Sequence, residues 1–309
     1  MKYQHFPPLG RDLSRLVLGT AAYEHAPLDA SLDVFDAFRQ LGGNVVDTGR
    51  EYGNAEPVLG RWLRERGVHE EIVILTKGAH HDKDTGRKRV NPAEITQDLE
   101  ESLQILGRSS IDVYCLHRDD PTAPVGPILE TLNLHRRAGR VRVLGASNWT
   151  VARLDETAQY AAQHALDSFA CSSPGLSLAA PREEPWPGCV TIHERATRAW
   201  YAQRLLPVFA WSSLAGGFFA GVLGADVTRV YETAGNAERR RRAQALGART
   251  GATASQVALA WVLHQPFPTY ALVGPRTVGE LRESVGALDL ALTPAELRWL
   301  DLEPDAEGL

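Results

Sequence analysis

The chain has 309 residues, of which 44% are hydrophobic and 23% charged, and its formal net charge is −5. This composition excludes a disordered chain, and its acidic balance argues against a nucleic-acid-binding protein, which would carry a basic surplus. No apolar run is long enough to span a bilayer, and the first residues lack the apolar core of a signal peptide. The three scattered cysteines, Cys115, Cys171 and Cys189, fit neither a disulfide framework nor a zinc site. We therefore expect a cytoplasmic protein without bound metal and without a nucleic-acid or membrane partner.

Basic residues are almost all arginine. Only four of the 33 are lysine, at positions 2, 77, 83 and 88. Lys2 is terminal, and Lys83 and Lys88 lie in a polar stretch, but Lys77 ends the apolar run IVILTK. A single strand-end lysine is usually a surface residue whose charged end reaches water. Lys77 therefore needs partners before it can be given a function.

Short apolar runs alternate with amphipathic segments along the chain. The runs expected to be strands span residues 16–18, 45–46, 72–75, 111–116, 141–144, 169–171, 208–211 and 271–273. The segments expected to be helices span residues 30–41, 55–66, 92–106, 124–138, 150–163, 193–205, 253–265 and 277–289. Asn91 before Pro92 is a typical helix start, and Thr293 before Pro294 predicts a final helix.

Eight strand–helix units in about 300 residues favour an α/β fold, namely a single (β/α)₈ TIM barrel over residues 1–309. The G-x-G-x-x-G fingerprint of open dinucleotide-binding sheets follows none of the strands. Two connections are long, a proline-rich one at 173–192 and a glycine-rich one at 213–236. Because both follow strands, we expect them as functional loops on the C-terminal face of the barrel, where active sites lie.

Polar residues end three of the predicted strands: Asp47, Lys77 and His117, with Tyr52 in the loop after Asp47. A barrel brings these strand ends together around one mouth. A buried ammonium would lower the pKa of a nearby tyrosine, and a carboxylate would balance the ammonium. A neutral imidazole could then orient a carbonyl oxygen beside the phenol. The set is typical of a proton relay to a carbonyl that gains a hydride, which implies a nicotinamide cofactor.

Several segments in order resemble the aldo-keto reductase superfamily, including members similar to aryl-alcohol dehydrogenases and potassium-channel β subunits. They are LVLGTAAY (16–23), GGNVVDTGREYGNAEPVLGRWL (42–63), VILTKG (73–78), IDVYCLHRDD (111–120), VLGASNW (143–149), VFAWSSLAGGFF (208–219) and LVGPRTVGELRES (272–284). The resemblance implies a TIM barrel and NADP(H)-dependent reduction of aldehydes, ketones or sugar carbonyls. It assigns Tyr52 as general acid, Lys77 and Asp47 as the pair that tunes it, and His117 as the residue that orients the carbonyl.

The resemblance also implies cofactor contacts at the nicotinamide end. Ser147 and Asn148 match the pair that binds the carboxamide, and Ser173 stands where the family has a glutamine. Trp211 matches the aromatic residue against the nicotinamide face, although a core tryptophan is the simpler interpretation. The strand-end residues assigned to the same end are Gly19, Thr20 and Asp47.

At the phosphate end, the resemblance assigns the pyrophosphate loop and the adenosine site. Arg276 is assigned to the adenosine 2′-phosphate, which its planar guanidinium fits, although an ordinary arginine at a helix start is the alternative. The complete set at this end is Ser212, Leu214, Gly216, Gly274, Arg276, Glu283 and Ser284.

Other features receive simpler interpretations. The run Arg239–Arg242 follows Glu238 and is expected on a solvated helix. His80, His81 and Asp82 are adjacent and diverge, so we do not expect a metal site. The Arg-Asp-Asp after His117 is expected to form local ion pairs. Two other functions stay open: a cofactor-binding regulatory subunit of a partner protein, and a sugar-ring redox enzyme with a tightly held, recycled cofactor.

Overall fold

The computed structural model describes residues 1–222 and 224–303, and at its centre lies a closed barrel of eight parallel strands. Their order around the barrel is β10-β3-β4-β5-β6-β7-β8-β9, so each strand pairs with its neighbours in the chain and the last returns to the first. The strands are β3 (Leu16–Gly19), β4 (Val45–Asp47), β5 (Val73–Gly78), β6 (Ile111–Leu116), β7 (Val141–Ser147), β8 (Cys171–Ser173), β9 (Val208–Ala210) and β10 (Thr269–Val273). This confirms the predicted (β/α)₈ TIM barrel.

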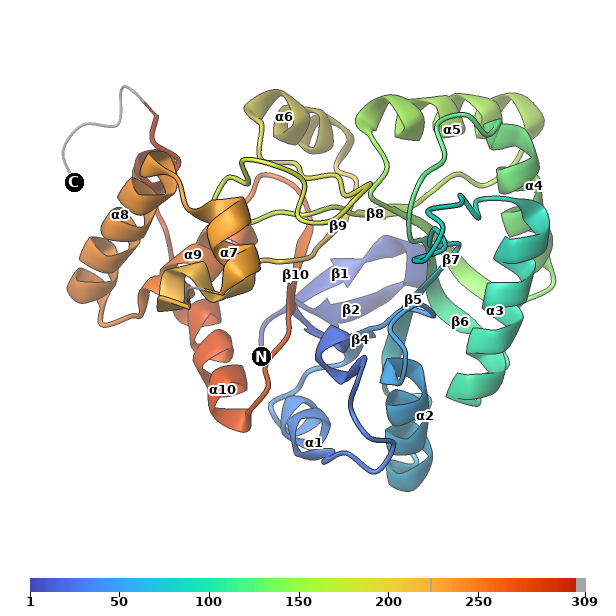
Figure 1. The fold of residues 1–309 in the computed structure, drawn as a ribbon, viewed down its shortest axis with the longest axis horizontal. Helices are drawn as coiled ribbons and strands as arrows, with labels where there is room; N and C mark the ends of the chain where they lie inside the picture. Colours follow the sequence, from blue (N-terminus) through green and yellow to red (C-terminus); the bar gives the residue numbers. More distant parts are fainter. Residues whose placement is uncertain (223, 304–309) are drawn as a thin grey trace.

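Helices surround the barrel, and one follows each strand (Figure 1). Their bounds are α1 (Asp33–Gln40), α2 (Ala55–Arg66), α3 (Pro92–Leu106), α4 (Val125–Arg137), α5 (Val151–His164), α6 (Arg195–Arg204), α7 (Ala225–Tyr231), α8 (Ala234–Thr250), α9 (Ala254–Leu263), α10 (Val278–Gly286) and α11 (Pro294–Leu300). The two starts expected from sequence are present: the side chains of Asn91 and Thr293 accept hydrogen bonds from the backbone of Glu94 and Glu296. These bonds satisfy amides that an open helix end leaves unpaired.

A hairpin that the sequence pattern did not reveal closes the N-terminal end of the barrel. It consists of β1 (Tyr3–Phe6) and β2 (Arg11–Ser14), and Figure 1 shows it faintly at the far end of the strands. Phe6 enters the barrel and packs edge-to-face on Phe209 and Tyr270, with ring centroids 5.6 and 5.8 Å apart. The hairpin therefore seals this end with an apolar plug and leaves only the opposite end for a ligand.

The barrel interior is filled by alternate residues of the strands. Val73 and Leu75 of β5 belong to the interior cluster, whereas Ile74 between them packs with the surrounding helices. The interior cluster contains Phe6, Leu13, Val17, Val45, Val73, Leu75, Val113, Cys115, Val143, Cys171, Phe209, Tyr270 and Leu272. This period of two follows from the pleat of the strands, and it fixes which side of the sheet every strand residue faces.

The two long connections are more regular than the sequence suggested. Within 213–236, apart from residue 223, the structure has a short 3-10 segment (Ala215–Ala220), helix α7 and the start of α8, so the expected glycine-rich loop is partly helical. Within 173–192, Gly175 donates to Val190 and accepts from Ile192 at 2.9 Å, and Trp211 donates to Pro174. Backbone hydrogen bonds therefore join this segment to itself and to the end of β9.

Among the described residues, the structure contains no helix that combines the length and the apolarity needed to cross a membrane.

Replacement of Gly145 by alanine should destabilise the barrel by about 1–3 kcal/mol, because it adds a methyl group to a filled interior. A Cβ at this position of β7 would lie 2.6 Å from the Cys115 sulfur and 2.9 Å from the Cys171 sulfur. Guanidinium-induced unfolding measures the change. Gly279→Ala is the control, since the nearest atom to its Cβ would be the Thr277 hydroxyl at 3.7 Å. Equal stability of both variants and the unsubstituted protein would show that the interior can absorb the methyl group.

Candidate active site

The inward alternation of every barrel strand ends, in the strand or one residue beyond it, at a residue that the sequence singled out. On β5, the inward residues Val73 and Leu75 are followed by Lys77, and the same step of two reaches Asp47 after Val45. Continued around the barrel, the alternation gives Gly19, Asp47, Lys77, His117, Ser147, Ser173, Trp211 and Gly274. The C-terminal end of the barrel is therefore lined by polar, aromatic and glycine residues directly above an apolar interior.

Lys77 and Asp47 form a buried ion pair in this ring. The Lys77 Nζ donates to Asp47 Oδ2 at 2.6 Å and to the Thr48 carbonyl at 2.9 Å, and the two charged side chains are 2% and 3% exposed. Burial alone lowers the pKa of Lys77, but the Asp47 carboxylate opposes that effect, and the net shift is upward. Burial raises the pKa of Asp47. The Thr20 amide and hydroxyl both donate to the Asp47 carbonyl at 3.0 Å and hold this strand end in place.

Tyr52 lies against this ion pair from the loop after β4. The Lys77 ammonium is 5.1 Å from the centre of the Tyr52 ring, and the Tyr52 hydroxyl is 3.4 Å from His117 Nε2. Burial raises the pKa of Tyr52 above its usual value, and the Lys77 charge only partly offsets that shift. The expectation of a lowered pKa was therefore wrong for the protein alone, because removal of water around the phenol outweighs the neighbouring ammonium.

His117 is neutral at physiological pH. Burial lowers its pKa well below the usual value, and the charges of Lys77 and Arg118 lower it further. Its Nδ1 atom is buried and has no hydrogen-bond partner among the described residues. A Cβ on Gly49 would lie 3.4 Å from the Tyr52 ring and 3.5 Å from the His117 ring, so this glycine lies beside both rings.

His80 is a neighbour of the site that sequence reasoning missed. Its ring packs edge-to-face on His117 with centroids 4.7 Å apart, and its Nδ1 donates to the His81 carbonyl at 2.8 Å. Burial lowers the pKa of His80 to about 3, so its ring is neutral. Its place two residues beyond β5 was the available signal, but the adjacent histidines were considered only as metal ligands, and that interpretation was rejected.

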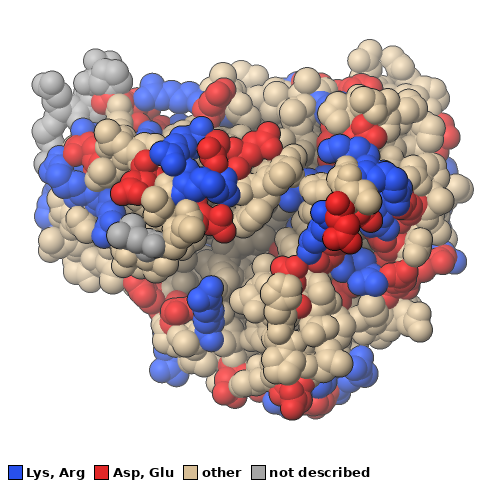
Figure 2. Space-filling model, viewed as in Figure 1, with Lys and Arg blue, Asp and Glu red and all other residues tan. Residues whose placement is uncertain are grey.

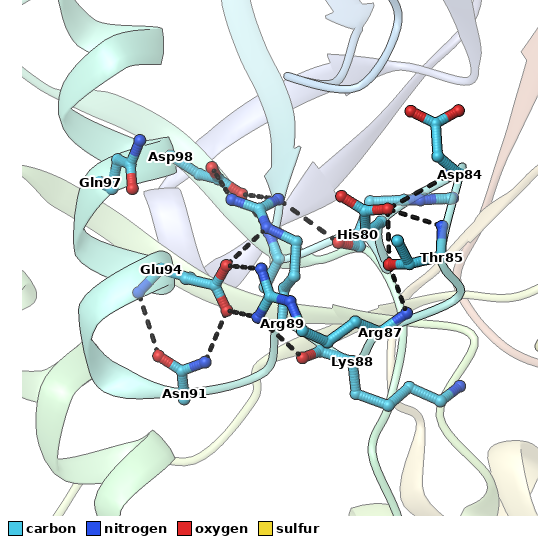
Figure 3. A network of polar contacts seen from close by, with 12 residues as sticks. His80, Asp84, Thr85, Arg87, Lys88, Arg89, Asn91, Glu94, Gln97 and Asp98 are labelled. Atoms are coloured by element: carbon cyan, nitrogen blue, oxygen red, sulfur yellow. Dashed lines mark hydrogen bonds and ion pairs between the residues drawn. The ribbon is translucent and has the colours of Figure 1, made fainter.

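The segment that carries His80 is fastened to the first turns of α3 (Figure 3). The Arg89 guanidinium donates to both oxygens of Asp98, at 2.7 and 3.0 Å, and to the His80 carbonyl at 3.3 Å. Asp98 also accepts from the Ala79 amide at 2.7 Å. A second carboxylate, Glu94, accepts from Arg89 at 2.9 Å. These charged hydrogen bonds fix the backbone on both sides of His80 and thereby the ring that supports His117.

The residues assigned to the nicotinamide end lie together, but their hydrogen bonds differ. Asn148 is fully engaged: its amide nitrogen donates to the His117 carbonyl and the Ser147 hydroxyl, and its oxygen accepts from Val190. The Ser147 hydroxyl donates to the Ser173 carbonyl at 2.8 Å. The Ser173 hydroxyl, in contrast, is buried without a partner among the described residues. Ser173 is therefore the member of this group that is free to bond a ligand.

The segment after β9 is shaped by unusual backbone angles. Ser212, Ala215 and Gly216 have φ values of 53°, 49° and 64°, which turn the chain sharply after Trp211. Ser212 and Leu214 are half-buried, and Gly216 is exposed. The indole nitrogen of Trp211 is buried without a hydrogen-bond partner among the described residues. The turn therefore leaves polar backbone and an unused donor next to the barrel mouth.

The residues assigned to the adenosine end follow β10. Gly274 and Arg276 are exposed, and the Arg276 guanidinium makes no ion pair within the described part of the chain. The Ser284 hydroxyl donates to the Glu280 carbonyl one turn earlier, and Glu283 accepts from the Thr253 hydroxyl. Arg276 is thus available to an anion, while Ser284 and Glu283 already contact the protein.

The face at the open end of the barrel is hollowed near its centre, and Figure 2 shows uncharged residues in the hollow and charged side chains around its edge. The geometry thus joins a buried ion pair, a tyrosine and a neutral histidine at one ligand-accessible end. A sequence model described as the aldo/keto reductase family matches residues 15–301. The chain belongs to the aldo/keto reductase family.

Curated members of the family align with nearly the whole chain. An uncharacterized oxidoreductase, YrpG of Bacillus subtilis, is 27% identical over 100% of this chain and 98% of its own length. Aldo-keto reductase YhdN of the same organism is 24% identical over 91% of this chain and 87% of its own. A putative voltage-gated potassium channel subunit beta of Schizosaccharomyces pombe is 26% identical over 84% of this chain and 80% of its own length. The family membership therefore supports an oxidoreductase.

In this aldo/keto reductase, His80→Gln should make the free energy of unfolding less dependent on pH between about 6.5 and 3. Folded His80 stays neutral down to about pH 3, whereas the unfolded histidine binds a proton below its ordinary pKa of 6.5. The contribution of His80 to the free energy of unfolding is therefore complete above pH 6.5. As the pH falls below 6.5, this contribution decreases by at most about 1.4 kcal/mol per pH unit, the value for one proton. Urea unfolding at several pH values measures the slope.

The exposed His25 supplies the control, since His25→Gln should leave the slope unchanged. An unchanged slope in His80→Gln would mean that His80 does not contribute to the acid sensitivity.

Proposed function

We propose that the protein is an NADP(H)-dependent carbonyl reductase that converts aldehydes, ketones or sugar carbonyls to alcohols. The observation that carries this proposal is the position of the Tyr52 hydroxyl. It lies 3.4 Å from a neutral His117 and against the buried pair of Lys77 and Asp47. Carbonyl reduction needs one proton donor beside one orienting group, and these side chains supply both.

Tyr52 acts as the proton donor to the carbonyl oxygen. A phenol is protonated at neutral pH, and burial keeps the pKa of Tyr52 above its usual value in the protein alone. As negative charge grows on the substrate oxygen, the phenol proton moves to it and the phenolate is left beside Lys77. The ammonium stabilises that phenolate, and Asp47 holds the ammonium in place.

His117 orients the carbonyl oxygen toward Tyr52. A protonated imidazole would compete with the phenol as acid, but burial and the neighbouring Lys77 charge keep the pKa of His117 low. The neutral ring has one N–H to donate. Its packing against His80, with centroids 4.7 Å apart, limits the rotation of the ring. His117 is thus a hydrogen-bond donor of fixed direction.

The residues at the barrel end fit a nicotinamide nucleotide. The unpartnered Ser173 hydroxyl, with Ser147 and Asn148 beside it, would hold the carboxamide, and Trp211 would contact the ring. When bound, the nucleotide supplies the hydride. The strand-end residues Gly19, Thr20 and Asp47 line the same end. We propose that the pyrophosphate and the adenosine of the nucleotide contact a further set of residues: Ser212, Leu214, Gly216, Gly274, Arg276, Glu283 and Ser284.

A regulatory subunit that binds cofactor without turnover is the second candidate, because the chain is similar to a protein named as a potassium channel subunit beta. Negligible turnover on every carbonyl tested, with retained cofactor binding and co-purification with a membrane protein, would favour it. A sugar-ring redox enzyme with a recycled cofactor is the third, and nicotinamide that survives gel filtration would point to it. The complete proton relay favours the reductase.

Tyr52→Phe should lower the rate of aldehyde reduction by about 10²- to 10⁴-fold, the usual contribution of a positioned acid. Loss of absorbance at the reduced-cofactor band measures turnover, and fluorescence titration checks that cofactor binding is retained. Tyr160→Phe is the matched control, since the Tyr160 hydroxyl donates to Glu130 on the surface. Equal turnover of Tyr52→Phe and the unsubstituted protein would remove the proposed acid.

Arg276→Ala should weaken NADPH binding by about tenfold to a hundredfold and leave NADH binding unchanged, because a charged hydrogen bond to phosphate contributes about 1.5–3 kcal/mol. Fluorescence titration with both cofactors gives the two dissociation constants. Arg282→Ala removes an exposed arginine from the same region and serves as the control. An unchanged preference in Arg276→Ala would show that another group selects the cofactor.

A further inference from the structure

Arg118, the residue directly after the catalytic His117, is a buried cation without a carboxylate partner. Arg118 is 7% exposed. Nη1 donates to the His117 carbonyl at 3.0 Å and Nε to the Pro187 carbonyl at 3.3 Å. Among residues 1–222 and 224–303, no aspartate or glutamate oxygen lies within ion-pair distance of its guanidinium. Because a guanidinium has five N–H donors, several remain for a ligand.

The acidic residues next to Arg118 in sequence do not neutralise it. Asp119 accepts instead from Arg153, at 3.0 and 3.2 Å, and Asp120 accepts from the amide and hydroxyl of Thr122. The expectation that the Arg-Asp-Asp run forms local ion pairs is therefore wrong, because the ion-pair partner of Asp119 is the distant Arg153. A buried charge without a counter-charge is unfavourable. The fold nevertheless directs the carboxylates of both neighbouring residues away from the Arg118 guanidinium.

The Arg118 charge acts on the reaction centre. After burial and Lys77, Arg118 is the next cause that lowers the pKa of His117, and it also opposes the rise in the pKa of Tyr52. The same charge lowers the pKa of His80, after burial. The Arg118 guanidinium is thus bonded to the His117 backbone, and its charge acts on both members of the Tyr52–His117 pair.

The segment that covers Arg118 is the long connection after β8. A Cβ on Gly188 would lie 3.5 Å from Arg118 Cδ, so the segment packs directly on the arginine stem. In the same segment Trp186 is 51% exposed, and its ring centre is 6.1 Å from that of Trp211. Arg118 is thus enclosed between the catalytic histidine and an aromatic edge of the mouth.

We propose that Arg118 is a substrate-binding residue that selects carbonyl compounds carrying an anionic group, a carboxylate or a phosphate. The inference rests on the proposed carbonyl reduction. The planar guanidinium binds either anion through paired hydrogen bonds and gains the counter-charge that the protein does not supply. The anion also places the carbonyl of a short substrate near Tyr52 and His117.

Two substrate pairs test this selection and distinguish the two anions. The carboxylate pair is 4-carboxybenzaldehyde and its methyl ester, and the phosphate pair is glycolaldehyde phosphate and glycolaldehyde. In at least one pair, the unsubstituted enzyme should have a kcat/KM about tenfold to a hundredfold higher for the charged member, mainly through KM. No preference in either pair would overturn the proposal.

Arg118→Met should abolish that preference, because it should raise KM for the charged member by far more than any change that it causes for the neutral member. Arg118→Lys should retain part of the preference, because it retains the charge. Lys83→Met is the control: it also removes one positive charge, but Lys83 already pairs with Glu24 at 2.7 Å and Glu51 at 3.4 Å. An equal loss for both members in Arg118→Met would assign the arginine only to holding the loop, and would overturn the proposal.

A binding measurement separates this proposal from the proposed function. With NADP⁺ present, 4-(hydroxymethyl)benzoate should quench tryptophan fluorescence at concentrations about tenfold lower than its methyl ester, and Arg118→Met should remove the difference. Turnover of neutral aldehydes without this difference would overturn the anion site and leave the reductase. Absence of all turnover, with the difference intact, would overturn the reductase and leave the anion site. A matching loss of NADPH affinity in Arg118→Met would assign the charge to the cofactor and overturn the proposal.

Discussion

The alternation of side chains along eight closed parallel strands is the constraint on which the site depends. Because the pleat has a period of two, a strand that fills the barrel with Val73 and Leu75 must direct Lys77 inward as well. The same rule applies to Asp47 after Val45 and brings both charges into one buried layer, 2.6 Å apart. Closure of the sheet leaves no other place for them, and the hairpin plug at the opposite end confines the polar layer to one mouth.

Charge balance differs between the inner and outer parts of this mouth. Lys77 is neutralised by Asp47, so the inner pair holds its geometry without a ligand. Among the described residues, Arg118 has only backbone carbonyls as partners, while Asp119 beside it pairs with Arg153. Two positive centres and one negative centre therefore act on Tyr52 and His117. That imbalance adds to burial in keeping the His117 imidazole neutral, and it is the basis of the proposed anion site.

The loop after β5 is fixed largely by charged hydrogen bonds. Arg89 joins Asp98, Glu94 and the His80 carbonyl, so the segment after β5 is held against α3 and supports the ring of His117. Such bonds suit a surface loop, which has little apolar area to bury but must keep one direction. The position of the His117 ring thus depends on residues more than ten positions away in the sequence.

The sequence by itself determined the barrel and most helix bounds, and it singled out the four residues of the proposed proton relay, because strand period and strand-end position are local properties. It did not reveal the β1–β2 hairpin, the helix α7 or the support of His117 by His80, which depend on contacts between distant segments. Nor did it give the sign of the Tyr52 pKa shift, since burial is set by the whole fold. Above all, only the tertiary structure decided which arginine pairs with Asp119. Arg118 is adjacent to Asp119 in sequence, but the fold places the guanidinium of the distant Arg153 against the Asp119 carboxylate.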